Sequence, residues 1–292
     1  MKHSDQHTSQ AFGSDNNLYL CRVKKELIIT STSNPRVKEV SGLDKVRNRK
    51  ESGSFLIEGL REVRMAVKAG YKIDYFLRCP DILAQPDPVQ SGAGEWLISS
   101  EVFSKLAVRE NSGGLLAVAK MKSHGLETIT PGSNSLFIVL ESVEKPGNLG
   151  AILRTADAAG VDGVLVCDPQ TDLYNPNIIR SGLGSLFTVP IGITDSFSAI
   201  SFLKKHGISI YATYLEASVP YDSVDFQKSS AIVMGTEATG LSQEWLKASD
   251  QNIIIPMYGN VDSMNVSVST AIVTFEAVRQ RRSSGIEPSS KK

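Results

Sequence analysis

The stretch Ser263-Met264-Asn265-Val266-Ser267-Val268-Ser269 leads into an apolar pattern that continues to about Arg282 and reads as a helix. Serine and asparagine are favoured at helix starts, because the first backbone N–H groups have no partner within the helix. A cap needs one such residue, whereas this stretch offers Ser263, Asn265 and Ser267. The surplus of polar groups favours a ligand or substrate site at the mouth of the helix.

Two earlier segments also combine polar residues with glycines at defined spacings. Residues 148–156, Asn-Leu-Gly-Ala-Ile-Leu-Arg-Thr-Ala, fit N-x-G-x-x-x-R-x-A, and residues 234–242, Met-Gly-Thr-Glu-Ala-Thr-Gly-Leu-Ser, fit G-x-E-x-x-G-L. A third pattern, I-P-M followed by S-x-N-V-S, spans residues 255–267. In this order and spacing the set closely resembles the SpoU (TrmH-like) family of RNA ribose 2′-O-methyltransferases. These belong to the trefoil-knotted (SPOUT) methyltransferases, which use S-adenosylmethionine.

The resemblance extends upstream of these motifs. Asn34-Pro35-Arg36 and residues 55–59, Phe-Leu-Ile-Glu-Gly, resemble the family's N-terminal RNA-binding domain, which has a fold like ribosomal protein L30e. We therefore expect an α/β protein with a smaller L30e-like domain over residues 27–125 and a knotted, parallel-sheet methyltransferase domain over residues 135–282. Residues 126–134 are the expected linker, and residues 1–26 and 283–292 are expected to be a mobile tail and a polar tail.

The periodicity of the second half supports a parallel sheet on its own. Apolar strand patterns, among them residues 136–140, 163–167, 186–189 and 231–234, alternate with helical patterns such as residues 149–159. Such alternation is typical of a parallel sheet covered on both faces. Since knots are nearly absent from proteins, the pattern alone predicts an unknotted sheet, and the knot enters only through the resemblance. In the first half, one helical pattern runs from Asn34 to Val46.

Composition limits the class of protein. The chain has 292 residues, 41% of them hydrophobic, which is enough for two domains with cores of their own. The three cysteines, Cys21, Cys79 and Cys167, lack metal-site or disulfide spacing, and there is neither a signal-peptide pattern nor a membrane-length apolar run. These features predict a cytoplasmic protein without a membrane span or a metal.

A net charge of zero hides an asymmetry that bears on RNA binding. Residues 27–125 contain 15 Lys and Arg against 11 Asp and Glu, whereas residues 131–282 contain 10 against 15. Six of the basic residues lie between positions 34 and 50. A basic run can be a solvated helix face, but next to a domain that resembles an RNA binder it favours phosphate contacts. The RNA-binding candidates are Asn34, Arg36, Arg47, Arg49, Lys50 and Glu58.

The cofactor candidates come from the second and third motifs. Glycines such as Gly235, Gly240 and Gly259 permit sharp turns with positive φ and close approach of a ligand to the backbone, although each could be a plain turn. The resemblance implies that Met234, Gly235, Thr236, Gly240, Ile255, Met257 and Met264 contact S-adenosylmethionine. No glycine-rich turn follows the strand at residues 136–140, which counts against a Rossmann-type enzyme.

The resemblance also implies the catalytic set: Arg154 with Asn148, Glu237, Ser263 and Asn265. Guanidinium groups stay protonated in proteins, so Arg154 suits a clamp on phosphate and developing negative charge better than a general base. Structural alternatives remain for four of these residues: a solvent-facing cation for Arg154, a helix-start carboxylate for Glu237, and a helix cap for Asn148 or Asn265. The first motif departs from the commoner family pattern at Lys145, where an acidic or amide residue often precedes the proline.

The expected activity is methyl transfer from S-adenosylmethionine to a ribose 2′-hydroxyl in structured RNA. The two-domain layout favours ribosomal RNA over transfer RNA as the substrate. The alternatives are a tRNA 2′-O-methyltransferase, a non-catalytic ribosome-assembly factor of the same fold, and an unrelated nucleotide-binding α/β enzyme. The family usually forms homodimers, and residues 269–282 offer an apolar helix stripe for such an interface.

Overall fold

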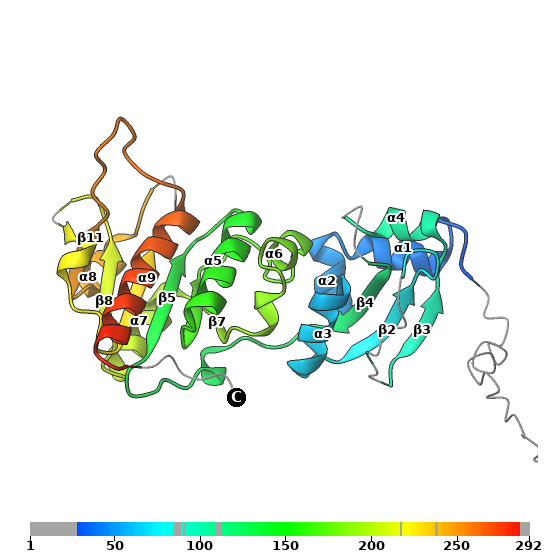
Figure 1. Ribbon diagram of the computed structural model, residues 1–292, viewed down its shortest axis with the longest axis horizontal. Helices are drawn as coiled ribbons and strands as arrows, with labels where there is room; N and C mark the ends of the chain where they lie inside the picture. The colour runs from blue at the N-terminus through cyan, green and yellow to red at the C-terminus, as the bar shows by residue number, and fades with distance from the viewer. Residues whose placement is uncertain are drawn as a thin grey trace, which may run out of the picture.

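The chain forms two α/β domains that lie side by side along its longest axis (Figure 1). The structure is a computed structural model, and it describes residues 28–83, 89, 92–108, 113–216, 218–236 and 239–286. The tail expected over residues 1–26 lies outside the described residues, as does the part of the tail expected over residues 283–292 that follows residue 286. No helix in the described ranges combines the length and the apolar character needed to cross a bilayer.

The N-terminal domain is a four-stranded sheet with helices on both faces. Its strands are β1 (Ser54–Glu58), β2 (Ile73–Arg78), β3 (Gly94–Leu97) and β4 (Leu115–Lys120), in the order β1-β4-β2-β3. Its helices are α1 (Pro35–Gly42), α2 (Val46–Ser52), α3 (Leu60–Lys68) and α4 (Ser100–Leu106). The single helix expected from Asn34 to Val46 is wrong, because α1 ends at Gly42 and the Asn48 amide donates to the Gly42 carbonyl across the turn at 2.8 Å.

The C-terminal domain is a seven-stranded sheet in the order β7-β6-β5-β10-β8-β11-β9, and every neighbouring pair is parallel. Its strands are β5 (Leu136–Glu141), β6 (Gly163–Cys167), β7 (Ile191–Thr194), β8 (Ser209–Thr213), β9 (Val219–Pro220), β10 (Ser230–Met234) and β11 (Gln251–Ile254). Its helices are α5 (Pro146–Ala159), α6 (Pro176–Ser181), α7 (Ser196–Lys205), α8 (Gln243–Ala248) and α9 (Val266–Ser283). Short 3₁₀ turns are η3 (Leu126–Thr128), η4 (Ser185–Phe187) and η5 (Tyr221–Ser223).

Two hydrophobic layers cover the parallel sheet. Helices α5, α6 and α9 pack on one face, and α7 and α8 pack on the other, as Figure 1 also shows. The central strands β5, β6 and β10 are buried along their whole length, as strands of a sheet covered on both faces must be. The α/β class and the order of the two domains predicted from the sequence are confirmed.

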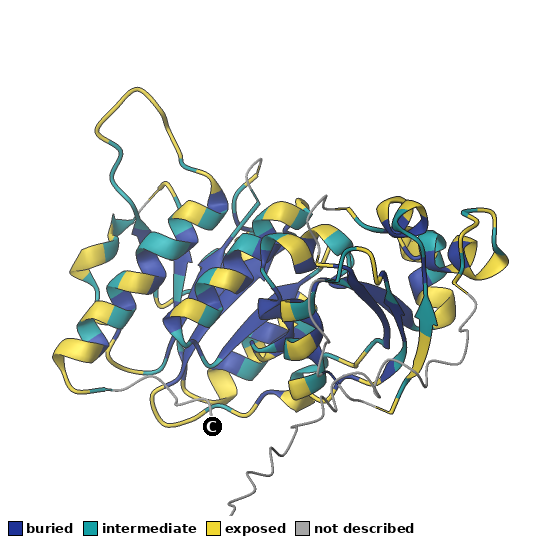
Figure 2. Cartoon of the chain, turned by 45° about the vertical axis from the view of Figure 1, so that its right-hand side comes forward, coloured by how far each residue is buried: buried dark blue, intermediate teal, exposed yellow. Residues whose placement is uncertain are grey.

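One apolar cluster joins the two domains. The Phe55 ring of β1 lies 4.4 Å from the Tyr174 ring and 6.2 Å from the Phe187 ring, centroid to centroid, and Tyr71 packs edge-on against Phe187 at 5.1 Å. All four side chains are buried. Figure 2 shows that buried residues, drawn in dark blue, are concentrated in the strands of the sheets. The aromatic contact between the domains explains why the strand expected at residues 186–189 is wrong: that apolar run is the turn η4, and it faces the other domain instead of continuing the sheet.

The expected linker is not a free connection. Ile129 is buried in the layer beneath α7, and Leu126 of η3 packs against the same layer. Residues 126–129 thus belong to the packing of the C-terminal domain.

Candidate functional site

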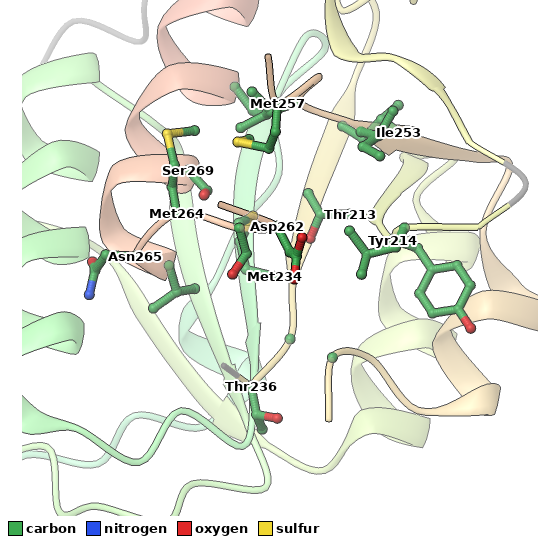
Figure 3. Close-up of a pocket in the computed structure, with 18 of the residues that line it drawn as sticks. Thr213, Tyr214, Met234, Thr236, Ile253, Met257, Asp262, Met264, Asn265 and Ser269 are labelled. Carbon is green, nitrogen blue, oxygen red and sulfur yellow. The ribbon is translucent and has the colours of Figure 1, made fainter. Parts of the chain in front are cut away.

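A cavity of about 680 Å³ opens at the carboxyl end of β8, β10 and β11, where the strands meet the start of α9. All seven cofactor candidates line it: Met234, Gly235, Thr236, Gly240, Ile255, Met257 and Met264. Figure 3 shows Met264 and Asn265 on one side of the cavity, Ile253 and Tyr214 on the other, and Thr236 below. The sequence therefore predicted a set of residues that the fold brings together, from three segments that are separate in the chain.

The loop after β10 forms one wall of this cavity. Thr236 pairs with Gly240 as an isolated antiparallel bridge, and the Thr236 hydroxyl accepts a hydrogen bond from the Thr239 N–H at 2.9 Å. Gly240 has φ +69°, so it needs the conformational freedom of glycine. A Cβ at Gly235 would lie 2.3 Å from the Gly240 carbonyl carbon, so Gly235 allows the two ends of the loop to pack together.

Glycine permits positive φ at all three of these positions, but the three differ in whether they adopt it. Among them only Gly240 has it, and a Cβ at Gly259 would meet nothing within 4 Å. Gly259 lies in the exposed segment between β11 and α9, drawn in orange in Figure 1, which projects beyond the end of the sheet.

Asn265 links the third motif to the first. Its Oδ1 accepts from the Ser267 N–H at 2.9 Å, so Asn265 is the N-cap of α9. Its Nδ2 donates to Oδ1 of Asn148 at 3.1 Å. Asn265 is thus both a helix cap and half of an amide pair that bridges α5 and α9 beside the cavity. Ser263 also lines the cavity, on the segment just before this cap.

Asn148 is not a helix cap. Helix α5 begins at Pro146, three residues earlier than expected for a helix with Asn148 as its cap, because proline suits the first helical turn. Asn148 instead lies in that first turn and faces a smaller cavity of about 100 Å³. Lys145, Gly235 and Val266 also line this second cavity, which places it directly against the larger one.

Arg154 lies apart from both cavities. It is exposed on the outer side of α5, two turns beyond Asn148, and lines neither cavity. Glu237 is outside the described residues. The described chain thus brings together Asn148, Asn265 and Ser263 from the catalytic set, and it does not bring Arg154 to them.

A buried polar network holds the base of the cavity wall. Glu141, at the end of β5, accepts a hydrogen bond from the Ser242 N–H at 2.8 Å, just after the loop that contains Gly240. The Ser196 hydroxyl lies 3.4 Å from the other Glu141 oxygen and accepts from the Trp245 indole at 3.0 Å. Sequence reasoning missed Glu141. Its signal was an acidic residue at the end of an otherwise apolar strand.

Cys167 lies at the adjacent end of β6 and is buried and unoxidised. Burial, together with the neighbouring carboxylate of Asp168, raises the pKa of its thiol well above the usual range. The thiol is therefore neutral and inert at physiological pH. The described residues contain no cluster of His, Cys, Asp and Glu that could hold a metal ion.

Arg49, expected to bind RNA, is buried in the interface between the domains. Its side chain is 1% exposed, and its Nε donates to Asp172 of the C-terminal domain at 2.6 Å. Its Nη1 donates to the carbonyls of Leu43 and Asp44 at 2.7 and 2.8 Å. The prediction is wrong for this residue, because its guanidinium serves the packing of the two domains and cannot reach a phosphate.

The other RNA-binding candidates divide into exposed cations and structural groups. Lys50 and Arg47 are exposed on α2, and Arg47 pairs with Glu51 at 2.7 Å. The guanidinium of Arg36 stacks over the Trp96 ring at 4.7 Å and remains exposed.

Asn34 and Glu58 have local structural roles. Asn34 is the N-cap of α1, with its Oδ1 accepting from the Arg36 N–H at 2.9 Å. Glu58 accepts from the Val108 N–H at 3.0 Å, which ties β1 to the segment after α4. These bonds account for both side chains without a nucleic acid.

Comparison with protein families identifies both domains. Residues 135–275 match the model of the SpoU rRNA Methylase family, and residues 34–117 match the MRM3-like substrate binding domain. A 23S rRNA (guanosine(2553)-2′-O)-methyltransferase from Bacillus subtilis is 32% identical over 247 residues, which cover 85% of this chain and 97% of that protein. A tRNA (guanosine(18)-2′-O)-methyltransferase from Escherichia coli is 40% identical, but over only 52% of this chain and 66% of its own length.

Solved structures agree with these relatives. The AdoMet-bound rRNA methyltransferase from Sinorhizobium meliloti superposes with a TM-score of 0.79 at 31% identity, covering 88% of this chain and 98% of that one. The similarity therefore spans both domains and their arrangement.

Proposed function

This chain belongs to the SpoU methylase family, and from that premise we propose that it transfers a methyl group from S-adenosylmethionine to a ribose 2′-hydroxyl of ribosomal RNA. The observation that supports this most directly is the amide pair of Asn148 and Asn265, which joins the first and third motifs at the junction of the two cavities. The reaction needs a site for the methyl donor, a site for the ribose, and groups that align the two.

The larger cavity fits S-adenosylmethionine. Its volume of about 680 Å³ lies within the range of small-molecule sites, and its lining mixes apolar residues such as Ile253 with polar ones such as Thr236 and Ser263. Ile253, Ile255 and Met234 offer apolar surface to an adenine ring, while the loop around Gly235 presents backbone to the ligand. Bound there, the cofactor supplies an activated methyl group on its sulfonium.

The smaller cavity suits the target ribose. The amide pair offers neutral donors and acceptors, which can hold a hydroxyl without requiring a charge on it. Glu141 keeps the loop wall in place from behind, through its bond to Ser242. Arg154, which is exposed and lies apart, would act only when RNA or a second subunit brings phosphate or the reacting oxygen to it.

Ribosomal RNA is favoured because of the extent of the similarity. The B. subtilis rRNA enzyme matches both domains, whereas the match to the E. coli tRNA enzyme covers about half of this chain. We propose that the exposed cations Arg36, Arg47 and Lys50 of the N-terminal domain contact RNA phosphates.

We further propose a cytoplasmic homodimer. The free thiols of Cys79 and Cys167 suit a reducing compartment. The outward face of α9 exposes Val268 and Phe275 by 48% and 46%, which supports an interface there. Light scattering of the purified chain tests the dimer, and a monomer at micromolar concentration would exclude it.

The test of the activity is single-turnover transfer of labelled methyl to ribosomal RNA from a strain that lacks this gene. We expect one 2′-O-methylated nucleotide, located by mass spectrometry, with transfer RNA unlabelled. If transfer RNA alone carries the label, transfer RNA is the substrate in place of ribosomal RNA. RNA binding without any transfer would favour a non-catalytic assembly factor instead.

A further inference from the structure

Lys145 occupies a position that no other cation in the described part of the chain shares. It directly precedes α5 and lines both the larger and the smaller cavity. Among the described residues that form the two linings, it is the one Lys or Arg. Its neighbour three residues later is Asn148, half of the amide pair.

A lysine does not cap the helix at this position. Lys145 is the N-cap residue of α5, and its side chain makes no cap hydrogen bond, because an ammonium group has no acceptor. Asn, Asp or Ser would cap the helix there. The positive charge also opposes the positive end of the helix dipole. A residue that breaks two local rules at the edge of a cavity is typical of a functional site.

The negative charge of the surrounding domain makes a cation at this position important for RNA binding. The C-terminal domain is acidic, with 10 Lys and Arg against 15 Asp and Glu over residues 131–282, and it must nonetheless accept a polyanion. In RNA every 2′-hydroxyl has a phosphate on the adjacent 3′-oxygen. A ribose held at Asn148 therefore brings a phosphate to the first turn of α5, where Lys145 stands.

We propose that Lys145 binds the phosphate next to the target ribose and so orients the 2′-hydroxyl toward the larger cavity. This inference rests on the proposed function, since it concerns the same RNA. The carboxylate of the methyl donor is the other anion within the chemistry of this site. The phosphate is favoured because Lys145 is exposed and lines the smaller cavity together with Asn148.

The experiment compares Lys145→Gln and Lys145→Arg with the control Lys247→Gln, an exposed lysine of α8 that lines neither cavity. RNA affinity is measured on the full chain between about 50 and 200 mM salt, and cofactor affinity is measured by calorimetry. We expect Lys145→Gln to weaken RNA binding by about tenfold, the loss of one charged hydrogen bond. The slope of log K against log salt should fall by about 0.7–0.9, which corresponds to one phosphate.

The remaining outcomes separate the interpretations. Lys145→Arg should retain most RNA binding and methyl transfer, because either cation can contact a phosphate. If Lys145 instead removed the proton of the 2′-hydroxyl, arginine could not replace it. An unchanged salt slope in Lys145→Gln overturns the proposal. A loss of cofactor affinity with the RNA slope unchanged would assign the lysine to the carboxylate instead. If wild type and control bind RNA but transfer no methyl, the proposed function fails while the phosphate contact is still measured by the slope.

Discussion

Replacing Arg49 with methionine should destabilise the protein far more than the same change at its neighbour Lys50. The Arg49 side chain is 1% exposed and that of its partner Asp172 is 9% exposed, so the ion pair is buried between the domains. Methionine is apolar and lacks the guanidinium, so it leaves the Asp172 carboxylate unpaired and removes the donor to the Leu43 and Asp44 carbonyls. Removing one partner of such a pair costs about 3–5 kcal/mol of unfolding free energy. Lys50→Met should change it by less than about 0.5 kcal/mol, as for an exposed residue.

Urea unfolding of the full chain measures the difference, and the melting temperature should fall by about 6–10 °C for Arg49→Met. Adding Asp172→Asn should recover much of the loss, because it removes the uncompensated charge. RNA binding should show the opposite order: Lys50→Met flattens its salt dependence and Arg49→Met does not. Arg49→Met with near wild-type stability and a flatter salt slope would refute the reasoning and return Arg49 to the RNA-binding surface.

Four further outcomes are expected. Gly235→Ala should lower the unfolding free energy by about 1–3 kcal/mol and should also weaken cofactor binding, because its Cβ would meet loop backbone. Gly259→Ala, the control, should change neither the unfolding free energy nor the cofactor affinity measured by calorimetry. Asn265→Asp should preserve the cap of α9, and with it the melting temperature, but slow single-turnover transfer by about tenfold, because the donor to the other amide is lost. Burial lowers the pKa of His124, so the unfolded chain binds more protons below about pH 6.5. Unfolding free energy should therefore fall as the solution is acidified through that range, and His124→Gln should reduce this sensitivity in unfolding titrations at pH 5 and 7. Arg154→Lys and Arg154→Ala should both slow methyl transfer by about 10²-fold. The melting temperature should change little, because the side chain is exposed. Transfer by Arg154→Lys at the wild-type rate would show that Arg154 is only a surface cation.

The residues that line the cavity were predictable from the sequence where a motif determines both the backbone conformation and the neighbouring residues. Met234, Ile255 and Met264 lie on three separate segments, yet all line one cavity. Met234 ends a strand, Ile255 follows one and Met264 precedes a helix, all at the same end of a parallel sheet. Asn265 was weighed as either a cap or a site residue, and the structure gives it both bonds. Such dual use cannot be read from spacing, because the second partner comes from a helix more than a hundred residues away.

The sequence misled where burial depends on the other domain. Arg49 looks like its exposed neighbours in a basic run, and only the position of Asp172, 123 residues later, makes it a buried partner. Phe187 belongs to an apolar run that reads as a strand, and its burial comes from contact with Phe55 instead. Periodicity reports that a side chain is buried but not against which element, so both errors arise at the same interface.

The interface between the domains should also affect which residues relatives have at two positions. Tyr174 and Phe187 are 2% and 5% exposed, and each packs against an aromatic ring of the N-terminal domain. In a family member built from the methyltransferase half alone, the same two positions would meet water, where large apolar side chains are a liability for solubility. We expect polar residues there in single-domain relatives and aromatic or aliphatic residues in two-domain ones. Two positions outside every catalytic motif would then report which architecture a newly sequenced member has.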